Sequence, residues 1–266
     1  MPTISSGQSS HPGVLDLIKT IPNDTTLKNN LTSCAYMFTR CSNLTSIPQF
    51  STSRITNMQN MFEGCSSLKT IPYMDTSNVA EMQSMFNTSG IETIPLLNTS
   101  NCINMSYMFA SSNIQELPLL DTSKVKNMSY MFYYTQKLET IPLLNTSNCT
   151  NMSTIFSNSA KLKTIPQLDT SKATNFSNFA SSCPLLENAP ILDMGAVTST
   201  SYHRNMYASC PNLTDESLNN IMASLITATG ITSNKTLTYV GLNATQKATC
   251  QTLSNWTAFT NAGWTA

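Results

Sequence analysis

The chain carries very little charge for its size. Asp, Glu, Lys and Arg make up 11% of its 266 residues, and 14 basic residues balance 14 acidic ones, whereas soluble domains usually have about 25% charged residues. Proteins that bind nucleic acid through its phosphates show a basic excess. The balance therefore argues against a nucleic-acid partner, and Ser, Thr and Asn supply the polar surface instead.

Long apolar runs are absent as well. No stretch approaches the 18 consecutive apolar residues of a membrane-spanning helix, so we expect no membrane span. The first ten residues lack the basic and apolar segments of a secretory signal, so we expect no export signal.

Histidine and glycine are scarce, with two and eight copies. Neither His11 nor His203 lies in a nucleophile motif, and there is no glycine-rich phosphate loop, H-E-x-x-H or G-x-S-x-G pattern. We therefore expect no enzyme, and no catalytic residue, metal site or cofactor.

What the sequence does contain is a repeat. A proline recurs every 23 to 26 residues, and a phenylalanine recurs with it. The prolines are Pro22, Pro48, Pro72, Pro95, Pro118, Pro142, Pro166 and Pro190, and the phenylalanines are Phe38, Phe62, Phe86, Phe109, Phe132, Phe156 and Phe179. A period of this length is typical of leucine-rich-repeat arrays. One unit cannot bury its own apolar face, so neighbouring units must stack into a solenoid.

Each unit begins with a short strand pattern, as in Leu68 to Ile71. The strand should end at the proline, which lacks the N–H that a central strand needs. Asp-Thr-Ser or Asn-Thr-Ser follows and predicts a turn. These triplets begin at Asp75, Asn98, Asp121, Asn145 and Asp169. The alternation of Asp and Asn keeps the ionised carboxylates of adjacent coils apart.

The last part of each unit has a helical spacing, with Val125, Met128, Met131 and Phe132 on one face. The predicted fold is therefore an α/β repeat solenoid of leucine-rich-repeat-like coils of about 23–24 residues, with a stacked parallel sheet and short helical segments. An asparagine recurs beside the methionine slot, at Asn57, Asn104, Asn127, Asn151 and Asn175. We expect a stacked asparagine ladder there, with a metal or sugar site as the alternative.

Eight cysteines would indicate disulfides in a secreted chain, but seven of them occupy slots of the repeat. Cys41, Cys65, Cys183 and Cys210 share a slot with Thr88, Ser111, Thr135 and Ser159, Cys102 and Cys149 share one with Ile55, Val79, Val125 and Ala173, and Cys34 shares one with Met58, Met82 and Met105. We therefore expect free core thiols. Disulfides or a metal are the alternative, although no C-x-x-C spacing supports zinc.

The regular pattern ends near residue 213. Thr214 to Leu225 predicts a capped helix that Gly230 can end, residues 235–240 predict a strand, and residues 244–259 predict one or two helices. Trp256, Phe259 and Trp264 are suited to covering the last coil. The predicted domains are an N-terminal arm and cap at 1–30, the solenoid at 31–213, and a small α/β C-terminal cap at 214–266.

The segments Gly64 to Leu68 and Asn78 to Phe86 resemble the BspA-like leucine-rich-repeat proteins, and more closely their Met-Phe subgroup of mycoplasma and gut-bacterial surface proteins. Residues 217–221, 235–237, 253–255 and 262–264 are similar to the ends of such proteins in gut bacteria and their phages. The resemblance implies a role in adhesion and binding. Surface members usually carry an export signal, so its expected absence favours a phage virion.

Three surface columns vary while the core slots do not: the strand face, the slot after proline, and the slot before the second methionine. The last column contains Tyr107 and Tyr130, and with Tyr133 and Tyr134 they make four tyrosines on adjacent coils. They are the candidate binding surface, because tyrosines suit interfaces and sugars; the alternative is that they only cover the methionine core. The row Leu96, Leu119 and Leu143 after the prolines is interpreted as either internal packing or an oligomer contact.

The sequence thus predicts a non-enzymatic binding or structural protein. The first hypothesis is a virion protein, extracellular after lysis, that serves as a fibre, receptor-binding or capsid-decoration protein and engages a host cell-surface protein or glycan or other virion proteins. The second is a bacterial surface adhesin, and the third is a glycan-active enzyme that uses His203. A homo-oligomer is compatible with each.

Overall fold

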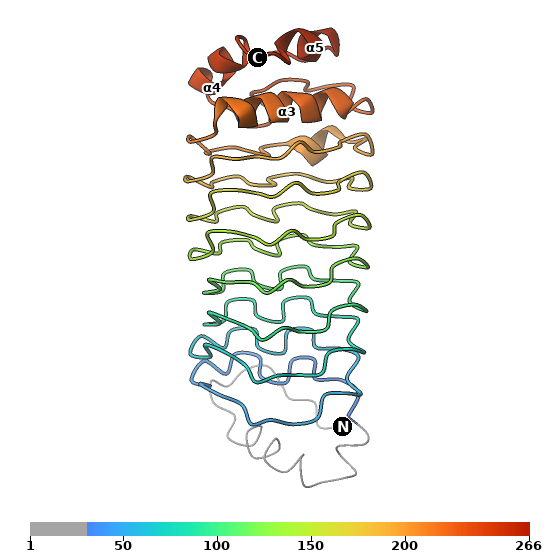
Figure 1. The fold of residues 1–266 in the computed structure, drawn as a ribbon, viewed down its shortest axis with the longest axis vertical. Coiled ribbons are helices and arrows are strands. Elements are labelled where there is room, and N and C mark those ends of the chain that lie inside the picture. The colour runs from blue at the N-terminus through green and yellow to red at the C-terminus, as the bar shows by residue number, and fades with distance from the viewer. Residues whose placement is uncertain (1–30) are drawn as a thin grey trace.

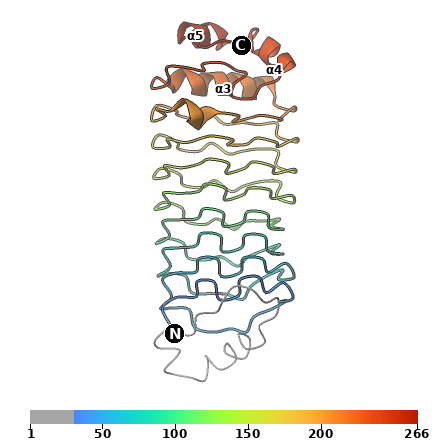
Figure 2. The same ribbon diagram turned by 180° about the vertical axis from the view of Figure 1, so that it is seen from behind.

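The computed structural model describes residues 31–266, which form a tall stack of flat coils (Figure 1). The coils lie directly above one another from the N-terminal end upward, and helices cover the last of them (Figures 1 and 2). The regular elements are η1 (Thr200–His203), α3 (Asp215–Thr227), α4 (Ala244–Cys250) and α5 (Trp256–Asn261). The predicted N-terminal arm and cap at residues 1–30 lie outside the described residues.

The predicted parallel sheet is wrong. Between residues 31 and 266 there is no β-strand; adjacent coils share isolated parallel bridges instead. Before the prolines, at most three backbone bonds join neighbouring coils, such as Glu92 N–H to the Lys69 carbonyl at 2.9 Å. The segment then reaches a proline, which has no N–H to offer, and a ladder long enough to make a strand does not form.

The predicted helical segment in each unit is also wrong. Val125, Met128, Met131 and Phe132 are all fully buried, as the spacing required, but their backbone is a chain of tight turns. Met131 N–H donates to the Met128 carbonyl three residues back, and Tyr130 has φ of 59°. A left-handed residue at this point of a turn is incompatible with an α-helix. Both structures bury residues three and four apart, so the spacing did not separate them.

The alternate N–H groups of this segment point along the axis to the next coil. In one coil, the N–H groups of Met58, Asn60, Phe62 and Gly64 donate to the carbonyls of the next coil at 2.8–3.0 Å. A helix would use these donors internally. The same four bonds recur in the coils that begin at Cys34, Met58, Met82, Met105, Met128, Met152 and Phe176. The turns therefore satisfy every second donor within the coil and the rest between coils.

The core is a column of phenylalanine rings inside the stack. Phe38, Phe62, Phe86, Phe109, Phe132 and Phe156 stack with centroids 5.3–5.9 Å apart and rings within 11° of parallel. The column then changes. Ala180, and not Phe179 as predicted, takes the phenylalanine slot, since Ala180 N–H makes the bond along the axis to the next coil. Phe179 takes a methionine slot and meets Phe156 edge-on at 88°.

The cysteines pack as small core residues, as predicted. All eight are unpaired; seven are buried and Cys41 is half-buried. Burial raises the pKa of the Cys65 thiol to about 12, so it is not a reactive thiolate. One prediction about their slot was wrong: Ser89 and Ser112, and not Thr88 and Ser111, share it. Ser89 Oγ donates to the Phe86 carbonyl at 2.7 Å, in the slot where the Cys65 thiol contacts the Phe38 carbonyl.

The Asp/Asn-Thr-Ser triplets form the predicted turns. The side chain of the first residue accepts the N–H of the serine, as in Asp121 to Ser123 at 3.0 Å. The threonine is buried and donates to the next coil, as in Thr122 Oγ1 to the Asn145 carbonyl at 2.8 Å. The asparagine ladder differs from the prediction. Bridges align the column, but Asn127 accepts the N–H of Ser129 in its own coil.

Helix α3 seals the last coil through two sets of residues. Leu218, Ile221, Met222 and Leu225 are buried, as predicted, and Thr214 caps the helix. A second row on α3 was missed: Ser217, Ser224 and Thr227 accept the N–H groups of Ala189, Leu192 and Met194 at 2.8–2.9 Å. The end of a solenoid leaves backbone donors as well as apolar surface uncovered.

In the rest of the predicted α/β cap, the helices are confirmed and the strand is wrong. Two helices form where residues 244–259 predicted one or two: α4 lies within that range, α5 starts in it and ends two residues beyond it, and Gly263, with φ of 83°, follows. The predicted strand at 235–240 is wrong, because that segment is a turn with a single bridge from Thr236 to Thr265. Trp264 and Phe259 are buried, and Trp256 is partly buried beside them.

Candidate binding surface

The four predicted tyrosines come together on the turn segment of two adjacent coils. The rings of Tyr107 and Tyr130 stack at 4.4 Å and within 5° of parallel. Tyr133 meets Tyr130 edge-on at 5.6 Å, and Tyr134 lies 6.2 Å from Tyr133. Tyr107 and Tyr134 are exposed, and the other two are half-buried. We call these four residues the tyrosine cluster.

Three members of the tyrosine cluster stand at left-handed backbone positions. Tyr107, Tyr130 and Tyr134 have φ of 57–59°. This conformation costs an ordinary residue roughly 1–2 kcal/mol and is favoured by Gly and Asn. Most other coils hold small or polar residues in the same two slots, namely Asn60, Gly64, Ser84, Thr88, Thr154, Asn158, Asn178 and Ser182, whereas the first described coil holds Tyr36 and Arg40 there. The tyrosines are therefore not there for backbone reasons.

The cluster presents aromatic faces and hydroxyl groups together. Burial by its neighbours, followed by the nearby phenols of Tyr130 and Tyr133, raises the pKa of Tyr107, so its hydroxyl is protonated and can donate a hydrogen bond. Tyrosine faces of this kind suit sugar rings and aliphatic or aromatic side chains, and the hydroxyls suit polar groups at the edge. Tyr36 occupies the same slot three coils before Tyr107 and is exposed, outside the cluster.

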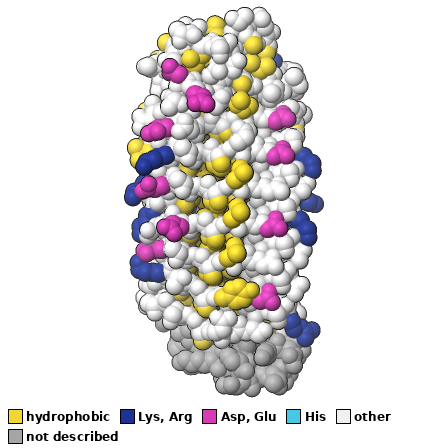
Figure 3. Space-filling view, viewed as in Figure 1, with side chains coloured by type: hydrophobic (Ala, Val, Ile, Leu, Met, Phe, Trp, Pro, Cys, Tyr) yellow, Lys and Arg dark blue, Asp and Glu magenta, His cyan; other side chains and the backbone are white. Residues whose placement is uncertain are grey.

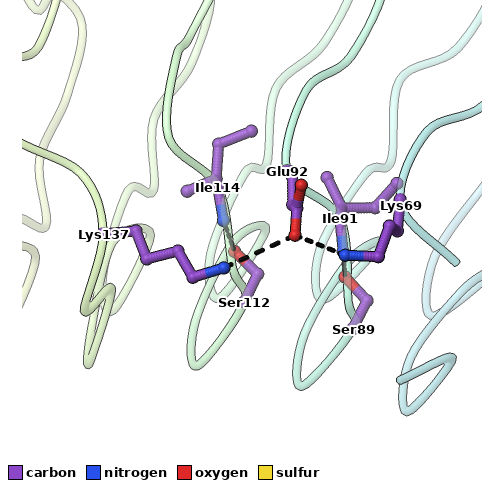
Figure 4. A network of polar contacts seen from close by, with 7 residues as sticks. All are labelled: Lys69, Ser89, Ile91, Glu92, Ser112, Ile114 and Lys137. Carbon is purple, nitrogen blue, oxygen red and sulfur yellow. Dashed lines mark hydrogen bonds and ion pairs between the residues drawn. The ribbon is translucent and has the colours of Figure 1, made fainter. Parts of the chain in front are cut away.

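The strand-face column holds charged pairs and not a pocket. Glu92 accepts from Lys69 at 2.6 Å and from Lys137 at 3.4 Å (Figure 4), and the hydrogen bond from Lys69 is the main reason that the pKa of Glu92 is lowered. Glu139 is paired with Lys161 and Lys163 at 3.7 and 3.5 Å. Such exposed pairs contribute little to stability.

The row after the prolines is exposed, so the internal-packing reading of it is wrong. Tyr73, Leu96, Leu119 and Leu143 are 60–64% exposed. A column of apolar side chains of this kind runs lengthwise along one face, with charged residues on both sides (Figure 3). No sequence signal separated this slot from the buried leucine that follows it.

His203 lies inside the cap and not at a surface site. It is fully buried between the rings of Tyr239 and Trp264, at 4.9 and 5.5 Å, and its Nε2 lies 3.3 Å from the Asn234 carbonyl. Desolvation lowers its pKa. Within residues 31–266, no cluster of His, Cys, Asp and Glu has the geometry to hold a metal ion. None of the helices in this range is long and apolar enough to cross a membrane.

Stacked coils with a regular core and variable surface columns define a solenoid repeat protein. The family model described as "Mycoplasma protein of unknown function, DUF285" matches residues 32–114 and 104–221. These ranges span most of the chain, which therefore belongs to this family, in agreement with the broad resemblance to BspA-like repeat proteins. No curated protein and no solved structure matches the chain.

Proposed function

We propose that this protein is a non-enzymatic binding protein whose tyrosine cluster contacts a host cell-surface protein or glycan. The observation that carries the proposal is the placement of Tyr107, Tyr130 and Tyr134 at left-handed positions where neighbouring coils hold Gly, Asn, Ser or Thr. A residue that costs stability and stays half-exposed in a cluster is best explained by a contact it makes.

The proposed setting is a phage virion, in which the protein serves as a fibre, receptor-binding or capsid-decoration component. The resemblance to the Met-Phe repeat subgroup found in gut bacteria and their phages supports this setting. The alternative is a bacterial surface adhesin, which the same subgroup and the family match also support. Antibody labelling of intact virions and of bacterial cells separates the two, because only one of them should be labelled before lysis.

The test of the tyrosine cluster replaces its members with residues that other coils use. Tyr107→Asn with Tyr130→Asn copies Asn60 and Asn178, which share their slot and their positive φ. Removing a central aromatic pair should weaken adsorption of the purified protein to host cells by at least tenfold. Tyr36→Asn is the matched control, since it makes the same change in the same slot outside the cluster, and it should bind as the unchanged protein does.

Two results would contradict the proposal. One is a folded double variant, with an unchanged circular dichroism spectrum, that still adsorbs normally. The other is an equal loss of adsorption in Tyr36→Asn, which would show that the left-handed slot and not the cluster matters.

A further inference from the structure

We propose that the exposed apolar row is a self-association surface on which a second copy of this chain docks in antiparallel orientation. We call the row the leucine stripe. It consists of the residues that follow six successive prolines, Gln49, Tyr73, Leu96, Leu119, Leu143 and Gln167. This surface is separate from the tyrosine cluster, so the inference does not depend on the proposed function.

The leucine stripe has the composition of an interface core with polar ends. Its four middle members are 60–64% exposed, although each precedes a buried core residue. A glutamine flanks the four apolar members on each side, and its amide donates to the carbonyl of the next coil: Gln49 to Tyr73 and Gln167 to Ile191, each at 2.7 Å. Beyond Gln167 the slot after Pro190 holds Ile191, which is 43% exposed and lies outside the six residues of the stripe. The coils stack directly above one another (Figures 1 and 2), so the stripe stays on one face (Figure 3). Apolar patches framed by polar residues mark interaction sites.

The order of residues along the leucine stripe is nearly the same in both directions. A twofold axis perpendicular to the stripe, passing between Leu96 and Leu119, brings Leu96 of one copy onto Leu119 of the other. It also brings Tyr73 onto Leu143, and Gln49 onto Gln167. A twofold interface requires such self-complementarity, because each contact occurs twice.

The acidic residues beside the leucine stripe select this register. Asp and Asn alternate from coil to coil, so an axis between two coils places each Asp opposite an Asn: Asp75 faces Asn145, and Asp121 faces Asn98. An axis through Leu119 would instead place Asp121 onto itself and Asp75 onto Asp169. Like charges brought together at an interface are strongly unfavourable.

The opposite flank agrees with the same register. Lys69 of one copy faces Glu139 of the other, and Glu92 faces Gln115, with the exposed Glu116 one residue further along the chain. With the axis through Leu119, Lys69 would face Lys163, and Glu92 would face Glu139. On both flanks, the axis through a coil brings like charges together, whereas the axis between two coils does not place them directly opposite each other.

The expected dimer is weak. The leucine stripe crosses six coils, roughly 24 Å at about 4.8 Å per coil, which is small for a specific interface. A dissociation constant on the order of micromolar is therefore expected. A weak contact of this kind becomes effective when several copies are held close together.

The first experiment is sedimentation of the full chain from about 1 to 200 μM, where the unchanged protein should pass from monomer to dimer. Leu96→Ser should raise the dissociation constant at least tenfold, because twofold symmetry removes the contact twice. Ile103→Ser is the matched control: Ile103 is 41% exposed but lies outside the leucine stripe, and its replacement should leave the dimer intact. A monomer throughout the concentration range, as expected for a stripe that binds another molecule, would overturn the proposal.

The second experiment tests the register by exchanging charges. Lys69→Glu should weaken the dimer by placing Glu opposite Glu139, and adding Glu139→Lys should restore most of the loss. In a parallel dimer Lys69 would face Asp75, so the second change would restore nothing. A dimer in which Leu96→Ser has no effect, or in which the charge exchange fails to restore binding, contradicts the antiparallel leucine stripe.

Discussion

The phenylalanine column makes a sharp prediction for Phe109→Ala. The Phe109 side chain is fully buried and lies between Phe86 at 5.6 Å and Phe132 at 5.9 Å. Truncating a buried phenylalanine costs about 3–5 kcal/mol, and each of the two ring pairs adds about 0.5–1.5 kcal/mol beyond its area. We therefore expect a loss near the upper end, about 5 kcal/mol, and about 1.5 kcal/mol for Phe109→Leu, which keeps most of the volume.

The assay is guanidinium unfolding followed by circular dichroism, together with amide hydrogen exchange. Coils contact mainly their neighbours, so exchange should accelerate at the amides of Phe86 and Phe109, which bond to the next coil. Leu218 in α3 should be affected least. A loss below about 2 kcal/mol for Phe109→Ala would refute this reasoning. It would show that neighbouring side chains of the column can move in and refill the space.

Three further changes test separate features. Gly90→Ala should destabilise the protein by roughly 2 kcal/mol, because the new Cβ would lie 2.1 Å from the Ser66 carbonyl oxygen. Thermal unfolding measures the loss. The control is Gly195→Ala, whose new Cβ approaches no backbone atom closer than 3.9 Å and which should cost much less. His203→Phe should flatten the fall in melting temperature as the pH drops below about 6.5, since a lowered pKa makes His203 stabilising above its unfolded pKa of about 6.5 and costly below it; an unchanged slope contradicts the buried neutral ring. Hydrogen bonds from Ser77 lower the pKa of Asp75, with the same effect at Asp121 and Asp169. The three carboxylates therefore favour folding above about pH 4 and lose that effect as the pH falls through their folded pKa values. The triple Asp→Asn variant should unfold less readily in acid than the unchanged protein, and an identical acid transition would count against the turn hydrogen bonds.

The repeat in the sequence predicted the stacking but not the path of the chain within a coil. The spacing of proline and phenylalanine predicted that the coils repeat, and the repeat predicted which positions are buried, such as Met128 and Phe132. The direction of each N–H did not follow, because tyrosine at 130 and 134 gives no sign of a left-handed backbone. The sequence therefore predicted helices and strands in segments where, in the structure, alternate N–H groups donate to the neighbouring coil.

At the candidate site, too, the sequence predicted some features and not others. The sequence placed Tyr107 and Tyr130 on neighbouring coils because their spacing equals one period, and the structure brings their rings together. It did not decide whether Leu96 faces in or out, because two leucines follow the proline and either could be buried. Phe179 was given the wrong slot because a phenylalanine stands where earlier coils have Met131 or Ile155, and the true phenylalanine slot holds Ala180, 24 residues after Phe156. The backbone bonds of Ala180 reveal this register.

The backbone bonds of the turn segments make the two ends of every coil chemically different. Met105, Tyr107, Phe109 and Ser111 offer N–H groups upward, and the carbonyls of Asn127, Ser129, Met131 and Tyr133 receive them. If the stack were broken at this junction, the turn segment of one fragment would end in a row of donors and that of the other in a row of acceptors. Two donor ends could not pair. The turn segments of two fragments could therefore pair again only head to tail, with the donors of one fragment facing the acceptors of the other.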